Sequence, residues 1–198
     1  MTGKISGTAK PTIGADFSKK ETLIDNQNVT LQVWDTAGQE KFQSLGYAFY
    51  RGADCCILVY DITNRKSFEA LQKWRDGFVE NAGPEDVKNF PFLLLGNKLD
   101  KEGDRQVSTA EGQEWARSHN NILFFETSAK EGHSVEEAFI EVARKGVKRM
   151  ESTTFSMPGS LSGAPGAIRL NPNLATDDDS GTGNNKRGAT RNSANCGC

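Results

Sequence analysis

The sequence of 198 residues lacks long apolar runs, an excess of positive charge and a cysteine framework. No apolar run reaches the roughly 18 residues that a membrane-spanning helix needs, and the first residues lack the apolar core of a signal peptide. The net charge of −2 gives no basic field to attract nucleic acid. The four cysteines are an adjacent pair, Cys55 and Cys56, and a terminal pair, Cys196 and Cys198. This spacing excludes a disulfide scaffold and indicates a reduced, cytosolic protein.

The most informative segment is residues 34–40, with the sequence WDTAGQE. It follows an alternating run, 29–34, that predicts a strand with one buried face. Asp35 at the end of this strand is suited to hold a water molecule on Mg²⁺. Gly38 has no Cβ and lets its backbone N–H approach a terminal phosphate, and Gln39 is placed to orient an attacking water. The segment predicts half of a phosphate site, with an ordinary strand-to-loop connection as the alternative.

A second polar segment, 97–100, follows a continuous apolar run that ends at Gly96. We expect it at the carboxyl edge of a parallel sheet, where α/β proteins bind ligands. The Asp100 carboxylate can accept hydrogen bonds from N1–H and the exocyclic amine of guanine, whereas adenine would leave it unpaired. Lys98 can lay its aliphatic stem along a base plane, and Asn97 can tie neighbouring loops together. Taken alone, this segment is also compatible with an ordinary polar loop.

A third segment, Ser128-Ala129-Lys130, follows the last apolar run, 122–126. Its position predicts the same edge of the sheet as Asp100. Backbone N–H groups there are expected to meet guanine O6. Three such segments at strand ends together indicate a guanine nucleotide site.

The pattern along the chain predicts an α/β doubly wound fold with a mostly parallel sheet flanked by helices. A turn at 25–28 favours an antiparallel hairpin near the start. The predicted strands are 16–24, 29–34, 55–61, 90–96 and 122–126, and the predicted helices are 68–79, 109–119 and 135–150. Residues 1–152 form the predicted domain. Residues 153–198, rich in Gly, Ser, Asn and Pro, are predicted to be a flexible tether.

From Pro11 to about Met150 the chain resembles the Rab small GTPases of the Ras superfamily. The resemblance rests on IGADF at 13–17, LQVWDTAGQE at 31–40, FYRGA at 49–53, LVYDIT at 58–63 and the terminal CGC. Within that family, GADCCILVYDIT, NFPFLLLGNKLD and NNILFFETSAKE are similar to the late-endosomal and lysosomal branch, Rab seven. The resemblance implies a P-loop-NTPase-like small G domain. It also implies binding of GTP, GDP and Mg²⁺, hydrolysis of GTP to GDP, and a switch function in endosome-to-lysosome membrane traffic.

The resemblance also implies roles for individual residues. Thr12 would be the threonine whose hydroxyl ligates Mg²⁺ and whose N–H meets the γ-phosphate, and Asp35 would hold Mg²⁺ through water. The effector surface would comprise Ile13, Phe17, Trp34 and Phe49. Core packing is the alternative for these aromatic side chains.

The terminal Cys196 and Cys198 resemble the doubly prenylated end of Rab proteins. Two lipids on a flexible tether meet the requirement for stable membrane anchoring. The implied location is the cytosolic face of endosomal and lysosomal or vacuolar membranes, in exchange with the cytosol. Implied partners are effectors, an exchange factor, a GTPase-activating protein and the prenylation escort machinery. The alternative is an unmodified tail with two free thiols.

The residues depart from the family pattern in one respect, because no G-x-x-x-x-G-K-[ST] segment precedes Thr12. We therefore expect the first strand, the phosphate loop and most of the first helix to be missing. Losing about four charge-assisted hydrogen bonds would cost roughly 6–12 kcal/mol of nucleotide affinity. Two sheet edges would lose their partner, and the hairpin would pack loosely. GTP hydrolysis by these residues would be impaired, so two alternatives stay open: a nucleotide-free interaction protein and an incomplete gene model or splice form.

Overall fold

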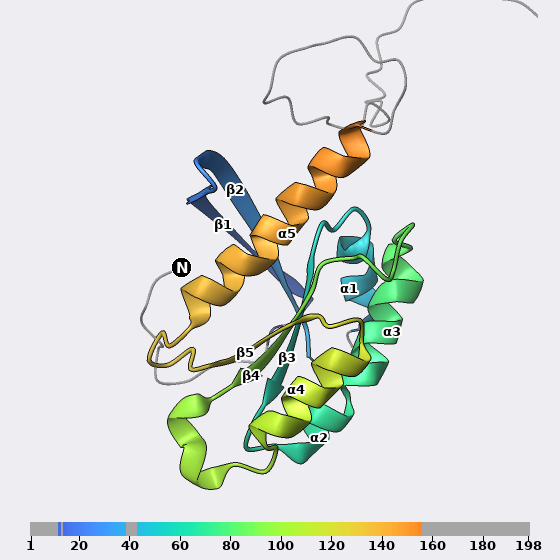
Figure 1. Cartoon of the computed structure of the whole chain (residues 1–198). Coiled ribbons are helices and arrows are strands. Elements are labelled where there is room, and N and C mark those ends of the chain that lie inside the picture. Colours follow the sequence, from blue (N-terminus) through green and yellow to red (C-terminus); the bar gives the residue numbers. More distant parts are fainter. Residues whose placement is uncertain (1–11, 13, 39–42, 156–198) are drawn as a thin grey trace, which may run out of the picture. The chain divides into compact units, whose positions relative to one another are not determined.

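The computed structural model describes residues 12, 14–38 and 43–155. The first strands, β1 (Ala15–Ile24) and β2 (Gln27–Thr36), form an antiparallel hairpin (Figure 1). Asp25 and Asn26 connect them with φ angles of 47° and 64°. Asp and Asn tolerate this left-handed region better than most residues, and a two-residue hairpin turn requires it. The predicted hairpin is confirmed, with a tighter turn than the sequence indicated.

A second sheet is parallel and contains β3 (Cys56–Asp61), β4 (Phe92–Asn97) and β5 (Leu123–Thr127) in the order β3-β4-β5. Asp61 is in register with Asn97, and Asn97 with Thr127. The carboxyl ends of the three strands therefore meet at one edge. The predicted parallel sheet is confirmed, and its edge carries two of the three polar segments.

Helices follow the strands, and two of them, at Gln43–Tyr50 and Leu99–Asp104, were not predicted from the sequence. They are α1 (Gln43–Tyr50), α2 (Arg65–Glu69), α3 (Leu71–Ala82), the 3₁₀ segment η2 (Leu99–Asp104), α4 (Thr109–Ser118) and α5 (Val135–Phe155). The helix predicted over 68–79 is divided at Ala70, which ends α2 and precedes α3. Helix α4 begins with a capping box: Ser108 Oγ accepts from the Glu111 N–H, and the Glu111 carboxylate accepts from the Ser108 N–H.

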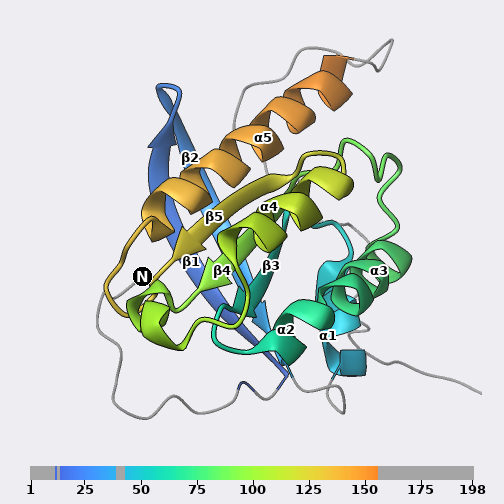
Figure 2. The ribbon, with the colours of Figure 1, turned by 60° about the horizontal axis from the view of Figure 1, so that its bottom comes forward.

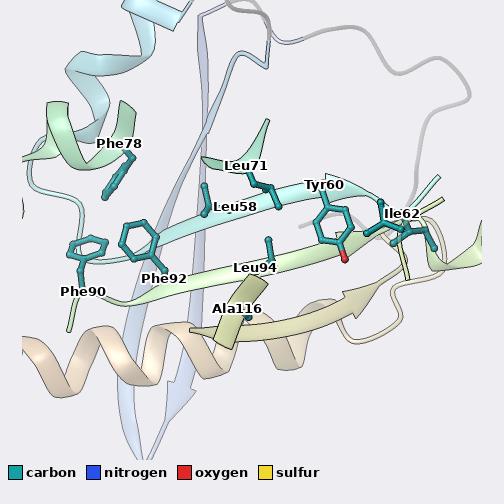
Figure 3. Close-up of a cluster of buried hydrophobic side chains, with 10 residues drawn as sticks. Leu58, Tyr60, Ile62, Leu71, Phe78, Phe90, Phe92, Leu94 and Ala116 are labelled. Atoms are coloured by element: carbon teal, nitrogen blue, oxygen red, sulfur yellow. The ribbon is translucent and has the colours of Figure 1, made fainter. Parts of the chain in front are cut away.

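The helices cover the two faces of the parallel sheet (Figures 1 and 2). One face carries Leu58, Tyr60 and Leu94, which pack in a buried cluster with side chains of α3 and α4 (Figure 3). On the opposite face Leu93 and Leu95 pack against α5. Burial on both faces explains why β4 reads as a continuous apolar run.

The continuous apolar run of β3 is typical of a strand buried on both faces, but one of its side chains is exposed. The Val59 side chain, on the face that α5 covers over β4, is 54% exposed. The reason is topological, because β3 is an edge strand of the three-stranded sheet. No pairing joins β2 to β3 within the described part of the chain, so the strands form two separate sheets.

Helix α5 continues to Phe155, beyond the predicted domain end at residue 152. The rest of the predicted tether, including Cys196 and Cys198, lies outside the described residues. Among the residues that the structure describes, no helix has the length and apolar character needed to cross a bilayer.

Candidate functional site

The predicted metal ligands Thr12 and Asp35 lie together. Thr12 Oγ1 donates a hydrogen bond of 3.0 Å to Asp35 Oδ2. Asp35 is the second-last residue of β2, and the Ala37 N–H donates to the Gly14 carbonyl at 2.9 Å just beyond it. This bond holds the two chain segments side by side. A hydroxyl and a carboxylate are hard oxygen donors, which fit Mg²⁺ with water completing its coordination.

The remaining predicted phosphate-side residues are less completely described. Gly38 is exposed, and an added Cβ would meet no atom within 4 Å, so its backbone is open to a ligand. Gln39, the predicted catalytic residue, and Ile13, a predicted effector contact, lie outside the described residues.

The base-side segments meet at the carboxyl edge of the parallel sheet, as expected. Ser128 Oγ donates to Asp100 Oδ1 at 2.7 Å, and Asn97 Oδ1 accepts from the Ala129 N–H at 3.0 Å. Lys130 Nζ lies 3.7 Å from Asp100 Oδ2. These contacts join the segment after β4 to the segment after β5. They also engage the Ala129 N–H, one of the groups predicted to face guanine O6.

The Asp100 carboxylate is electrostatically prepared to act as an acceptor. Its hydrogen bond from Ser128 lowers its pKa below the usual value, and the positive charges of Lys130 and Lys101 act in the same direction. Ser128 is fully buried, which fixes the donor. At neutral pH Asp100 is therefore ionised and accepts hydrogen bonds without donating any.

Asp61, at the end of β3, contacts the site and was missed by sequence reasoning. Its Oδ2 atom lies 2.6 Å from Lys98 Nζ, and its Oδ1 atom accepts from the N–H and hydroxyl of Thr63 at 2.9 and 2.7 Å. Burial raises the pKa of Asp61, but the bonds from Lys98 and Thr63 outweigh burial and lower it overall. The signal available in the sequence was its position at the end of a predicted strand, like that of Asn97.

Arg105 is a second residue that the sequence did not reveal. Its guanidinium donates to both carboxylate oxygens of Glu126 at 2.6 and 3.1 Å and to both of Glu102 at 2.9 and 2.6 Å. Glu102 follows the 97–100 segment, and Glu126 precedes the 128–130 segment. The side chains of Arg105 and Glu126 are only 16% and 14% exposed. Arg105 thus joins the two base-side segments through its contacts with Glu102 and Glu126. These charged partners raise the pKa of Arg105.

The predicted aromatic surface is assembled across the hairpin and α1. Phe17 lies opposite Trp34 in the strand register, with ring centroids 4.8 Å apart, and Trp34 stacks on Phe49 at the same distance. All three remain exposed, at 46%, 46% and 38%. Their exposure contradicts the core-packing alternative and leaves a contiguous aromatic patch on the surface.

Comparison with known proteins agrees with these features. The sequence profile of the Ras family matches residues 1–148. This chain belongs to the Ras family. It is 56% identical over 154 residues to the Ypt/Rab-type GTPase Rab7 of Neurospora crassa, covering 77% of this chain and 75% of the relative.

Two further relatives carry names from the same branch. The Ras-related protein Rab-7a of Paramecium octaurelia is 53% identical over 152 residues, covering 77% of this chain and 74% of the relative. The Ras-related protein Rab-7a of Dictyostelium discoideum is 52% identical over 162 residues, covering 82% and 80%. The resemblance inferred from the motifs is therefore confirmed: the chain is a Rab7-like member of the Ras family.

Proposed function

We propose that this chain is a GTP- and GDP-binding switch in traffic between endosomes and lysosomes. The observation that carries the proposal is the Asp100 carboxylate, which Ser128 holds at the carboxyl edge of the parallel sheet. An ionised carboxylate accepts hydrogen bonds from N1–H and the exocyclic amine of guanine, and adenine offers no matching pair of donors. Similarity to relatives named Rab7 supports the cellular role.

In this proposal the base lies between the two segments at the edge of the sheet. The Lys98 stem covers one face of the ring, while Asp100 reads its polar edge. Ala129 and Lys130 offer backbone N–H groups to guanine O6, and the Ala129 N–H is shared with Asn97 Oδ1. Guanine selectivity then depends on Asp100. With adenine, the partly buried Asp100 carboxylate would lose its hydration without gaining hydrogen-bond donors from the base, which is unfavourable for binding.

On the phosphate side, Thr12 and Asp35 would hold Mg²⁺, which neutralises phosphate charge when it is bound. The Thr12 and Gly38 N–H groups would sense the γ-phosphate, which couples nucleotide state to the segments on both sides of the hairpin. Gln39 would orient the water for in-line attack, or an activating partner would supply a glutamine in its place. Hydrolysis would then release these segments.

The aromatic surface and the chain end complete the proposal. Phe17, Trp34 and Phe49 would bind effectors, together with Ile13, and an exchange factor and a GTPase-activating protein would set the nucleotide state. Lipids on Cys196 and Cys198, delivered by the prenylation escort machinery, would hold the protein on the cytosolic face of endosomal and lysosomal membranes.

A second candidate function is an interaction protein that binds partners without nucleotide. It is favoured by the aromatic surface, whose three exposed rings are in contact with one another. Partner binding through this surface would then be independent of GTP.

Competition binding separates the two candidates. Purified protein would be titrated with fluorescent GDP, with and without Mg²⁺, and challenged with GDP or ADP. Displacement by GDP but not ADP, with tighter binding in Mg²⁺, supports the switch. An Asp100→Asn variant should lose the preference for GDP, whereas Asp104→Asn, an exposed neighbour in η2, should keep it. Equal displacement by both nucleotides contradicts guanine selectivity, and no binding at all contradicts the switch and favours the interaction protein.

A further inference from the structure

The side chain of Lys98 is held in a defined position by Asp61, a residue outside the three polar segments of the candidate site. Lys98 has a left-handed backbone, with φ 73° and ψ 37°, immediately after β4. This conformation is uncommon for a residue with a Cβ and marks a constrained turn. Its ammonium lies 2.6 Å from Asp61 Oδ2. A lysine has four rotatable side-chain bonds, so an anchor at its far end is needed to fix the path of its stem.

Asp61 is itself fixed, which qualifies it as an anchor. Its register partner across the sheet is Asn97, the residue before Lys98. The Ile62 N–H donates to the Asn97 carbonyl at 3.0 Å, so the ends of the two strands stay paired beyond Asp61. Two hydrogen bonds from Thr63 occupy Oδ1 and leave Oδ2 for Lys98.

The exposures of the Asp61 and Lys98 side chains are consistent with a Lys98 stem that is available to contact a ligand. The Asp61 side chain is 19% exposed, whereas that of Lys98 is 47% exposed. The charged end of Lys98 is therefore neutralised against the strand end, and part of its side chain faces solvent beside the base-side segments. A flat aromatic ligand can cover such a stem without removing an unpaired ammonium from water.

We propose that Asp61 is a positioning residue of the guanine site, holding Lys98 Nζ so that the Lys98 stem forms the platform on which the base stacks. The inference rests on the proposed function. It assigns Asp61 a role in stacking that is separate from the reading of the base edge by Asp100.

The two roles predict different selectivities. Stacking does not depend on the exocyclic amine, so Asp61→Asn should weaken binding of GDP and inosine diphosphate by the same factor. That factor is about tenfold, as expected when a long side chain must be ordered upon binding. Asp100→Asn should instead reduce the preference for GDP over inosine diphosphate, because hypoxanthine lacks the amine that Asp100 reads.

Asp61→Asn keeps an oxygen for the Thr63 bonds and replaces the charged oxygen that faces Lys98 with an uncharged NH₂ group, which cannot accept a hydrogen bond. Asp86→Asn is its matched control, because Asp86 Oδ1 also accepts from two backbone N–H groups, at Lys88 and Asn89, before the opposite end of β4. The control should leave both nucleotide affinities unchanged. Nitrogen-15 NMR of the lysine side chains supplies a readout without ligand: a slowly exchanging Lys98 Nζ signal in the parent protein should be lost in Asp61→Asn and kept in Asp86→Asn.

The outcomes distinguish this inference from the proposed function. If the parent protein binds GDP and Asp61→Asn binds it equally well, the role of Asp61 is wrong and the switch stands. If the NMR signal of Lys98 does not change in Asp61→Asn, the anchor is wrong whatever the affinities. If the parent protein binds no guanine nucleotide, both proposals fail. Equal weakening of both nucleotides, with loss of the Lys98 signal, supports the inference.

Discussion

The β1–β2 hairpin and the β3–β5 sheet are held by different kinds of contact. In β4, five of six residues are buried, whereas Ile24 is the only buried residue of the two hairpin strands. The sheet is stabilised by apolar clusters on both faces. The hairpin is joined to α5 by ion pairs, Lys20 with Glu136 and Asp25 with Arg144, and to α1 by the Trp34–Phe49 stack.

This difference separates the candidate site into two halves. The base-side residues project from the well-packed sheet, so their geometry is set by the same contacts that stabilise the fold. Asp35 belongs to the hairpin, and exposed ion pairs contribute little to stability. We therefore expect the hairpin to open at a lower free energy than the sheet. Four predictions address this contrast.

The largest expected effect comes from the ion pair between Arg105 and Glu126, which joins the two base-side segments. Glu126→Ala leaves Arg105 without its least exposed partner and should lower the free energy of unfolding by about 3 kcal/mol, near the lower end for buried pairs because both groups keep some exposure. Urea denaturation followed by tryptophan fluorescence measures it. Glu114→Ala, which breaks an exposed pair with Arg117, is the control and should cost less than about 0.5 kcal/mol. Equal effects of the two variants would contradict a structural role for the Arg105–Glu126 ion pair.

The packing of the sheet against α4 gives the next effect. A Cβ added at Gly112 would lie 2.6 Å from Tyr60 Oη and 2.7 Å from the Phe124 ring. Gly112→Ala should therefore destabilise the protein by about 2 kcal/mol through overpacking, despite the better helix propensity of alanine. At Gly103 an added Cβ meets nothing within 4 Å, so Gly103→Ala should have little effect. Thermal denaturation of both variants tests this, and a stabilised Gly112→Ala would show that α4 packs more loosely.

Sequence reasoning succeeded where short-range patterns determine the structure. The turn at Asp25, the start of helix α4 at Thr109 and the apolar run of β4 each depend on residues a few positions apart. The positions of Asn97 and Asp100 followed from the rule that parallel strands end at one edge.

Features that depend on distant partners were not predictable. Asp61 and Lys98 are brought together by strand pairing, and Arg105 and Glu126 by the packing of α4 and η2 beside β5. The exposure of Val59 depends on which strands pair with β3, and an apolar strand pattern does not encode its neighbours. These are the residues for which the structure added most to the functional interpretation.

The aromatic stack should affect the hairpin alone. Trp34→Ala removes ring contacts with both Phe17 and Phe49, which should lower the local opening free energy of the hairpin by about 1 kcal/mol. Amide hydrogen exchange measures this, with faster exchange in β1 and β2 and unchanged exchange in β4. Leu23→Ala is the control, since Leu23 is an exposed hairpin residue and 59% of it faces solvent. Faster exchange throughout the sheet would show that the two regions unfold together.

The smallest effect concerns the ion pair between the hairpin and α5. The hydrogen bond from Lys20 lowers the pKa of Glu136 below its ordinary value of 4.5. The contribution of this pair is therefore present above pH 4.5 and is lost as the pH falls through the lowered pKa. In an NMR titration, Lys20→Gln should return the pKa of Glu136 toward 4.5.

Glu111 provides an internal reference in the same titration. The Ser108 N–H and Arg65 lower its pKa to about 2, and none of these groups belongs to the hairpin. Lys20→Gln should therefore leave Glu111 unchanged while Glu136 shifts. If neither group responds, the hairpin does not rest on α5 through Lys20. If both respond, the variant perturbs the sheet as well, and the two regions are coupled more tightly than their contacts indicate.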